Sequence, residues 1–235
     1  MTDSNIALEI AVPALNEEAV IGETVERLRA ELLRLTPSHR IVVVDNGSRD
    51  ATTLRARAAG AAVITLGEHG KGRAVIEAAR ASGARIFGFI DADLSADPRD
   101  IEPLYRALER DECDIAIGSR LVDTSLVTRE RLRTLSSVIF NTFRKTLLGI
   151  SVKDTQCGLK LMNERGKATL SRCEETGWFF DMELLARAEH EGLRVHEFAI
   201  RWEEHRYVGR ESRLRMVRDG FGAIVAMFRI RRQIK

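Results

Sequence analysis

Residues 85 to 95 read Arg-Ile-Phe-Gly-Phe-Ile-Asp-Ala-Asp-Leu-Ser. The apolar run from Arg85 to Ile90 predicts a strand, and an Asp-Ala-Asp turn follows it directly. In an extended segment Asp91 and Asp93 point to opposite faces, but at a turn from strand to loop their carboxylates can converge. One could then hold a divalent metal, since Mg²⁺ and Mn²⁺ prefer carboxylates plus phosphate oxygens. Taken alone, so short a motif is explained equally well as an ordinary acidic turn before a helix start at Asp97.

Short apolar runs alternate with helical patterns on both sides of this segment. Further strands are predicted at Ile6–Val12, Ile41–Val44, Ala62–Leu66 and Asp114–Gly118, and helices at about Glu17–Leu35 and Ala74–Ala81. Strands separated by helices predict an α/β fold with a mixed, mostly parallel sheet flanked by helices. Ligands of such sheets bind beyond the carboxyl ends of the strands. Glu17, Asp45 and the Asp91/Asp93 pair all follow predicted strands, so this edge is the candidate site.

The second half of the sequence is less regular. Residues Arg129–Leu148 carry apolar side chains at helical spacing, and Asp154–Lys160 is polar and contains glycine, which predicts a loop. A helix is predicted at Asp181–Glu191 and a strand at Val195–Ile200.

Composition places the chain among globular proteins. Hydrophobic residues make up 44% and charged residues 31% of its 235 residues, which suits one large domain. Lys and Arg number 37 against 35 Asp and Glu, so the net charge of +2 does not indicate a nucleic-acid partner. Three dispersed cysteines predict neither disulfides nor a zinc site, which favours a cytoplasmic location. We find no signal peptide and no run of about 20 apolar residues that would span a bilayer.

The last stretch of the chain is basic and amphipathic. We expect residues 1–212 to form the main domain and residues 213–235 to form a helical appendage. The appendage could pack its apolar face on the domain, or lie on an anionic membrane surface. Gly220 and Gly222 weaken it as an isolated helix. We favour peripheral contact with the cytoplasmic face of a membrane.

Several motifs follow one another in a fixed order. Four of them accompany the ends of predicted strands, and one begins a helix. In chain order they are Pro13–Glu18, Val42–Thr52, Gly70–Ala74 at the helix start, Asp91–Ser95 and Gly118–Arg120. The ordered set resembles the family-two glycosyltransferases, which have the GT-A fold. Three later motifs resemble the dolichyl-phosphate glucose and mannose synthases, and the glucose branch more closely: Asp154–Lys160, Trp178–Leu185 and Gly209–Leu214.

The resemblance implies an activity and a donor site. It implies inverting transfer of glucose or mannose from a UDP- or GDP-linked hexose to a polyprenyl phosphate, with Mg²⁺ or Mn²⁺. The residues that it places around the donor are Pro13, Leu15 and Glu17 in the nucleotide pocket, Asp45 on the base, Asp91 near the sugar nucleotide and Asp93 on the metal. Two positions depart from the pattern, because Asn46 stands where many relatives have Asp and Ser95 where some have Gln.

An acceptor site is implied as well. Arg120 would face the acceptor phosphate, joined by Arg131 or Arg133, and Ser212 and Arg213 lie in a loop that could close over the diphosphate. Asp181 would lie near the donor sugar or the acceptor; the plainer alternative for Asp181 and Glu183 is a helix cap and an exposed carboxylate. Lys71 and Arg73 could contact phosphate near the backbone N–H groups of their helix start, or be surface charges. Taken alone, each of Arg120, Arg131 and Arg133 fits a surface arginine better than a site residue, and Arg120 is favoured as a site residue by its place at the end of a strand.

The chemistry of a phosphate acceptor suits these residues. A phosphate monoester has its second pKa near about 6, so it is a nucleophile at neutral pH without a strong general base. It needs cations to position it, and arginine offers a planar fork for that. Two alternatives remain open at this point. The acceptor could be a soluble sugar or small phosphorylated metabolite, or the protein could bind nucleotide sugars without catalysis, as a binding or membrane-scaffolding protein.

Overall fold

The computed structural model describes residues 6–122, 126–127, 146–203 and 226–234. The strands are β1 (Leu8–Ala14), β2 (His39–Asp45), β3 (Ala62–Thr65), β4 (Ile86–Ile90), β5 (Ile115–Ser119), β6 (Leu126–Val127), β7 (Leu159–Met162), β8 (Val195–Ala199) and β9 (Arg201–Trp202). The helices are α1 (Ile21–Leu35), α2 (Thr52–Ala58), α3 (Lys71–Ala81), α4 (Ile101–Glu109), α6 (Glu164–Ser171) and α7 (Phe180–His190), with a short 3₁₀ helix at Pro98–Asp100. Residues 226–234 are also helical.

A seven-stranded sheet in the order β3-β2-β1-β4-β7-β5-β8 forms the centre of the molecule. Every pair in it is parallel except the two that β7 makes with β4 and β5. The predicted mixed, mostly parallel sheet is therefore confirmed. Since β1, β2 and β4 run in the same direction, the turns that follow them lie along one edge.

Strand β7 was not predicted, because residues 154–160 were expected to be a loop. The loop ends at Gly158, and Leu159–Met162 runs antiparallel between β4 and β5. A lysine in the middle of Leu-Lys-Leu-Met obscured the strand, yet Lys160 is fully buried. Helices α2, α4 and α6 also lay outside the predicted elements.

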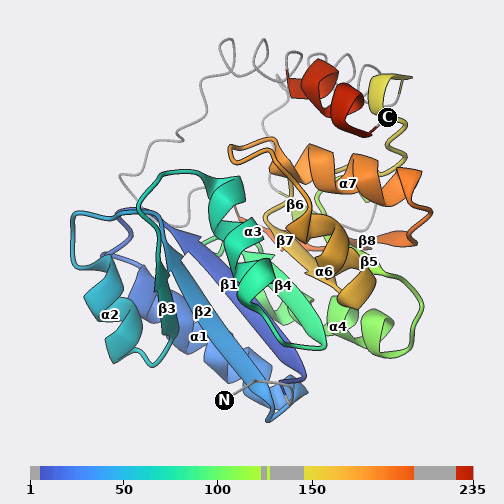
Figure 1. Ribbon diagram of the computed structural model, residues 1–235. Helices are drawn as coiled ribbons and strands as arrows, with labels where there is room; N and C mark the ends of the chain where they lie inside the picture. The colour runs from blue at the N-terminus through green and yellow to red at the C-terminus, as the bar shows by residue number, and fades with distance from the viewer. Residues whose placement is uncertain (1–5, 123–125, 128–145, 204–225, 235) are drawn as a thin grey trace.

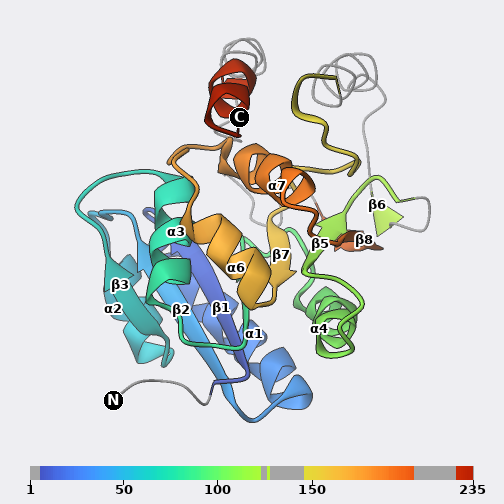
Figure 2. The same cartoon turned by 45° about the vertical axis from the view of Figure 1, so that its right-hand side comes forward.

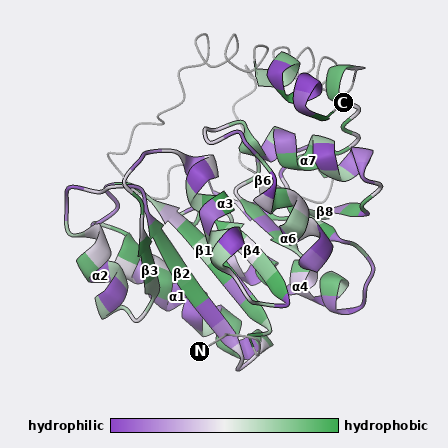
Figure 3. Cartoon of the chain, in the orientation of Figure 1, coloured by the Kyte–Doolittle hydropathy of each residue, from purple (hydrophilic) through white to green (hydrophobic). Residues whose placement is uncertain are grey.

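Helices cover both faces of the sheet (Figures 1 and 2). Side chains of α1 and α4 pack on Leu8, Ile10 and Val12 of β1 in one core cluster. Side chains of α3 and α7 pack on Phe87 and Phe89 of β4 in the other. The hydropathy colouring agrees with this layering, since the central strands are mainly green and the helices alternate green with purple (Figure 3).

Part of the predicted appendage packs on the domain. In the helix of residues 226–234, Met227 and Ile230 are fully buried in the same core cluster as α7. Phe228, Arg231 and Arg232 on the same helix are exposed. Within the described residues, no helix combines the length and the apolar character needed to cross a membrane.

The amino end of β5 is fixed by Asp114, at the edge of the sheet remote from the candidate site. Its carboxylate accepts hydrogen bonds from the Arg194 main-chain N–H at 2.9 Å, from Asn163 Nδ2 at 2.9 Å and from Arg165 at 3.2 Å. Burial would raise the pKa of Asp114, but these bonds outweigh it and lower the pKa to about 2. Asp114 is therefore a buried structural carboxylate.

Candidate active site at the carboxyl edge of the sheet

The turns after β1 and β2 are tied together by hydrogen bonds from their main chains. Asn16 N–H donates to Ser48 Oγ at 2.9 Å, and Glu17 N–H donates to Thr52 Oγ1 at 2.8 Å. Asn16 adopts a left-handed conformation with φ of 55°, which its short polar side chain tolerates. Pro13, Leu15 and Glu17, all predicted nucleotide-pocket residues, are thereby placed alongside the end of β2.

Asp45 ends β2 and is 3% exposed. Its carboxylate accepts the Ser48 N–H at 3.2 Å, so it stabilises the turn that follows the strand. A carboxylate has about four lone-pair positions, so this bond leaves capacity for a ligand donor. The neighbouring Asn46 is 5% exposed, and its Oδ1 accepts no hydrogen bond within the described part of the chain. A buried acceptor without a donor costs free energy, which a bound ligand with an N–H group would recover.

Asp91 and Asp93 lie in a turn that is fixed on several sides. Thr24 of α1 donates to Ala92 O at 2.6 Å, and Asp93 Oδ1 accepts the Ser95 N–H at 3.0 Å. Lys71 Nζ lies 2.5 Å from Asp91 Oδ1, and the Asp91 side chain remains 29% exposed. Burial lowers the pKa of Lys71, but the carboxylates of Asp91 and Asp181 outweigh it and raise the pKa above its ordinary value. Lys71 is thus a protonated partner of Asp91, and the surface-charge alternative for it is wrong.

The first N–H groups of α3 do not face an anion, contrary to the prediction for this glycine-containing helix start. Gly72 N–H donates to Gly177 O and Arg73 N–H donates to Thr176 O, both at 3.1 Å. A Cβ on Gly72 would lie 2.7 Å from the Cβ of Phe180, so only glycine permits this close approach. The loop of Thr176 and Gly177, about a hundred residues later in the sequence, accepts the hydrogen bonds of these N–H groups.

Arg120 follows β5 and is held in a fork by Asp154. Its Nε and Nη2 atoms donate to the two Asp154 oxygens at 2.7 and 2.8 Å, and its main-chain N–H donates at 2.9 Å. The guanidinium stacks on Trp202, 4.7 Å from the ring centroid. Burial raises the pKa of Asp154, but Arg120 outweighs it and lowers the pKa below its ordinary value. The pair is therefore ionised, and the sequence did not predict that Asp154 would fix Arg120.

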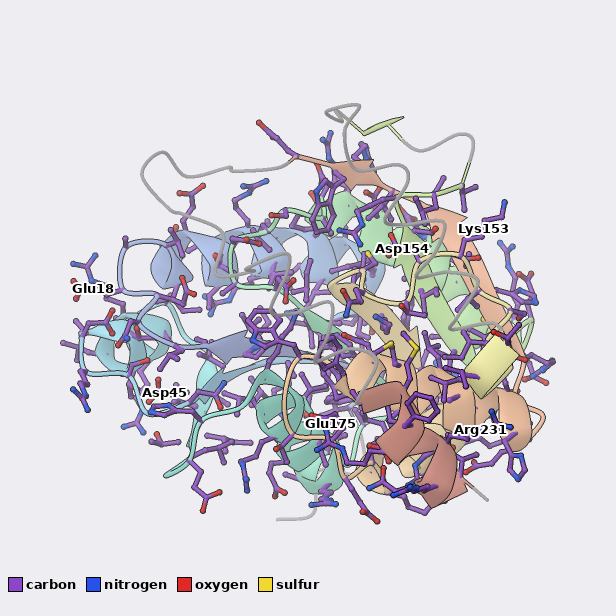
Figure 4. All side chains as sticks on the ribbon, turned by 90° about the horizontal axis from the view of Figure 1, so that it is seen from above. Glu18, Asp45, Lys153, Asp154, Glu175 and Arg231 are labelled. Atoms are coloured by element: carbon purple, nitrogen blue, oxygen red, sulfur yellow. The ribbon has the colours of Figure 1, made fainter. Side chains whose placement is uncertain are left out.

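Strand β9 links this arginine to the Asp-Ala-Asp turn. Trp202 forms an antiparallel bridge with Ala96, and Glu203 N–H donates to Ser95 O at 3.0 Å. Ser95 is thus held by its main chain. Seen from above, Asp45 lies toward the left of the molecule and Asp154 right of its centre, while Glu175 lies near α3 and the helix of residues 226–234 (Figure 4). Asp45 therefore lies apart from Arg120 along this edge, whereas the Asp-Ala-Asp turn is joined to Arg120 through Trp202 of β9.

Asp181 and Glu183 lie in the first turn of α7 and are both buried. Asp181 Oδ1 lies 2.7 Å from Lys160 Nζ. Glu183 accepts the N–H groups of Glu174 and Glu175 at 2.9 and 2.7 Å. The alternative of a helix cap and an exposed carboxylate is therefore wrong, because neither side chain is exposed and the N-cap of α7 is Phe179, with no side-chain cap bond. Sequence reasoning missed Lys160, although a single lysine inside an apolar tetrapeptide was a signal.

Four predicted acceptor residues lie outside the described residues: Arg131, Arg133, Ser212 and Arg213. The predicted helix Arg129–Leu148 lies mostly there too. Their roles stay predictions.

A divalent metal fits the donor atoms at the Asp-Ala-Asp turn. Within the described residues no three His, Cys, Asp or Glu side chains gather into a complete metal cage. Mg²⁺ and Mn²⁺ sites that use substrate phosphates need only one or two carboxylates, which Asp91 and Asp93 supply. The ammonium of Lys71 against Asp91 shows that the turn attracts a cation.

Gly158→Ala should weaken binding of the nucleotide sugar that the family resemblance implies at Asp91 about ten-fold, because it disturbs that carboxylate. A Cβ at Gly158 would collide with the Asp91 carboxylate. Titration of the protein with nucleotide sugar measures the change. Gly22→Ala is the matched control, since a Cβ on that glycine of α1 meets no atom within 4 Å. Equal affinity of the Gly158 variant and the wild type would show that binding does not depend on where Gly158 holds the Asp91 carboxylate.

The sequence of this chain is similar to a protein family and to several known proteins. Residues 9–166 match the family model described as Glycosyl transferase family 2. The dolichyl-phosphate beta-glucosyltransferase of Drosophila melanogaster is 33% identical over 223 residues, which cover 85% of this chain and 68% of that protein. Its human counterpart is 31% identical over 218 residues, covering 84% and 67%. Glycosyltransferase AglD of Haloferax volcanii is 29% identical over 230 residues, and the match covers 94% of this chain but only 36% of AglD.

Solved structures share the fold. Glucosyl-3-phosphoglycerate synthase from Mycobacterium tuberculosis superposes with a TM-score of 0.68 at 21% identity, covering 100% of this chain and 83% of that one. The same enzyme was crystallised with Mn²⁺, UDP and glucosyl-3-phosphoglycerate, and that structure also gives a TM-score of 0.68, at 20% identity, covering 100% and 82%. At such identities the likeness concerns the fold.

Proposed function

The chain belongs to glycosyl transferase family 2, and from that membership we propose that it transfers a hexose from a UDP- or GDP-linked donor to a polyprenyl phosphate. The observation that carries the acceptor assignment is the position of Arg120, which is fixed by Asp154 and stacks on Trp202, a residue bridged to Ala96 beyond the Asp-Ala-Asp turn. Relatives named dolichyl-phosphate beta-glucosyltransferase support it, as does a dodecaprenyl-phosphate galacturonate synthase of Rhizobium johnstonii at 29% identity, which covers 67% of this chain and 48% of that protein.

The donor is proposed to lie along the turns after β1, β2 and β4. Its base would meet Asp45 and the unpartnered Asn46 Oδ1, between the turn of Pro13–Glu17 and the end of β2. Its diphosphate and hexose would reach Asp91, and Lys71 would offset phosphate charge once it is released from that carboxylate. Asp93 would hold Mg²⁺ or Mn²⁺, which would stabilise the charge of the departing diphosphate.

The acceptor phosphate is proposed to lie against Arg120. A phosphate oxygen attacks the anomeric carbon as the bond between that carbon and the diphosphate breaks, and the configuration at that carbon inverts. The nucleophile already carries its electron pair, so no residue has to remove a proton. This accords with the carboxylates of the site, because Asp91, Asp154 and Asp181 each pair with a cation.

Peripheral contact with a membrane is proposed for the helix of residues 226–234. Its exposed Phe228 is followed by exposed Arg231 and Arg232, a pattern that suits an anionic interface. Trp178, in the loop that this helix contacts through Glu174 and Glu175, is also 51% exposed. The cytoplasmic face is the expected side.

Replacing Phe228 with Ser and Arg231 and Arg232 with Gln should reduce sedimentation with anionic vesicles at least about five-fold. Each arginine near such a surface contributes about 1 kcal/mol, and the aromatic ring contributes through burial. The buried Met227 and Ile230 are left intact, so the fold is retained. Arg55→Gln, Arg57→Gln and Leu54→Ser on α2 remove two exposed arginines and one exposed large apolar side chain elsewhere, and serve as the control. Unchanged sedimentation of the first variant would contradict membrane contact through this helix.

A donor panel tests the function directly. Labelled UDP-glucose, UDP-galactose, GDP-glucose and GDP-mannose are incubated with a short polyprenyl phosphate and Mn²⁺ or Mg²⁺, and products are extracted into organic solvent. We expect label in the organic phase with one donor, and its loss on addition of EDTA. Label found only in a water-soluble phosphorylated product would indicate a soluble acceptor. Binding of a donor without any turnover would indicate a non-catalytic protein.

A further inference from the structure

Two lysines and two aspartates form a row of two neighbouring ion pairs at the carboxyl end of β4. Lys160 of β7 lies 2.7 Å from Asp181 of α7, and Lys71 of α3 lies 2.5 Å from Asp91. The carboxylate of Asp181 is also near enough to Lys71 to help raise its pKa. Four separate elements therefore meet through alternating charges.

The inner pair of this row is sealed from solvent. Lys160 is 0% exposed and Asp181 is 3% exposed, and Lys160 Nζ lies 5.4 Å from the Phe89 ring centroid. Neither side chain is therefore placed to touch a substrate. A buried ion pair stabilises a fold no better than a well-packed apolar pair, because desolvating each ion costs several kcal/mol. Stability alone does not account for these two charges.

Each member of the pair fixes one neighbour of Asp91. Lys160 Nζ donates to Cys157 O at 2.6 Å, which holds the turn of residues 157–158. Gly158 in that turn lies directly against the Asp91 carboxylate. On the other side, Asp181 attracts Lys71, which contacts Asp91 Oδ1.

We propose that Lys160 and Asp181 are positioning residues that hold the Asp91 carboxylate between Lys71 and Gly158 for binding of the donor. The inference rests on the proposed function, in which Asp91 lies at the sugar nucleotide. It gives Asp181 a role that differs from the expected place near the donor sugar or the acceptor, since Asp181 acts here through other residues. Replacing either member shifts Asp91, and binding of the nucleotide sugar weakens before the acceptor is involved.

The test compares Lys160→Met, Asp181→Asn and the double variant Lys160→Met/Asp181→Leu. Binding of UDP-glucose and GDP-mannose is measured by calorimetry with Mn²⁺ and no acceptor, and thermal unfolding is measured on the same samples. We expect each single variant to lose stability and to bind its nucleotide sugar about ten-fold more weakly, the effect usual for residues that orient a ligand-binding group. The double variant should regain stability, since no buried charge is left alone, yet still bind weakly.

Asp114→Asn is the matched control, because Asp114 is an equally buried, arginine-paired carboxylate at the opposite end of the sheet. It should lose stability and keep wild-type affinity. If the double variant recovers both stability and affinity, or if the single variants bind as tightly as the control, the pair is only structural and the inference is overturned.

Failure of the proposed function gives a different result. A wild-type protein that binds a nucleotide sugar but forms no lipid-linked product contradicts the acceptor, while the binding comparison still decides the role of the pair. A wild-type protein that binds none of these sugars overturns both proposals.

Discussion

Asp93→Asn should reduce sugar transfer on the order of a thousand-fold while leaving the protein folded. An amide keeps the oxygen that accepts the Ser95 N–H at 3.0 Å, so the turn is retained. It removes the negative charge that we propose to hold a divalent metal at the leaving diphosphate. Loss of one preorganised group of this kind costs about 10²–10³ in rate, and loss of the metal's charge stabilisation adds to it. Initial rates at saturating Mn²⁺, with both substrates fixed, measure the effect.

Two further variants show whether the charge or the hydrogen bond of Asp93 matters. Asp93→Ala removes both the charge and the hydrogen bond, and should be at least as inactive as the Asn variant. Asp97→Asn, two residues beyond the Ser95–Asp93 bond, changes a carboxylate that pairs with Arg99 and should stay active. If Asp93→Asn transferred sugar at the wild-type rate while Asp93→Ala did not, the carboxylate would serve only to form the turn.

Arg120→Lys should lower kcat/KM for the polyprenyl phosphate about a hundred-fold with little change in donor affinity. Lysine keeps the charge beside Asp154, so the buried carboxylate is not left alone. It cannot form the two-point fork or stack on Trp202 in the same way, and a point charge positions a phosphate less well than a planar guanidinium. Kinetics with varied acceptor concentration, together with calorimetric titration of the donor, measure the two effects separately.

Arg110→Lys controls for the chemical change itself, because Arg110 is a surface residue 69% exposed in a pair with Glu112. Its kinetics should match the wild type. An Arg120→Lys variant with normal acceptor kinetics would remove Arg120 from the acceptor site. A loss of donor affinity equal to the loss of acceptor use would instead make Arg120 a general support of this edge.

The sequence predicted the framework of the sheet because the central strands are buried on both faces. Ile41–Val44 and Arg85–Ile90 are apolar runs that end abruptly in carboxylates, and such runs leave few alternatives to a strand. Parallel strands bring their carboxyl ends to the same edge, so Glu17, Asp45 and Asp91 were predicted to share it. The structure places them along that edge.

Contacts between polar groups of segments that are distant in the sequence were predicted wrongly or not at all. The helix start at Gly70–Lys71 has the composition of an anion site, yet Thr176 and Gly177 occupy two of its N–H groups. The first two residues of β7 fell within a predicted polar loop. The burial of Lys160 there is made tolerable by Asp181, 21 positions later, and by the hydrogen bond to Cys157 O. The lysine within an apolar tetrapeptide hints at burial, but no local pattern names the distant partner in either case.

The local pattern of apolar and polar residues therefore determined the fold class, the strand ends and the acidic turn. These features depend on which neighbouring side chains are buried and which are exposed to water. Tertiary structure alone decided which charges meet. Arg120 pairs with Asp154, which is 34 positions later in the sequence. Lys71 pairs with Asp91, from which it is separated by a helix and a strand. A buried charge is stable only with a partner close by, and folding, rather than spacing in the sequence, brings that partner within reach.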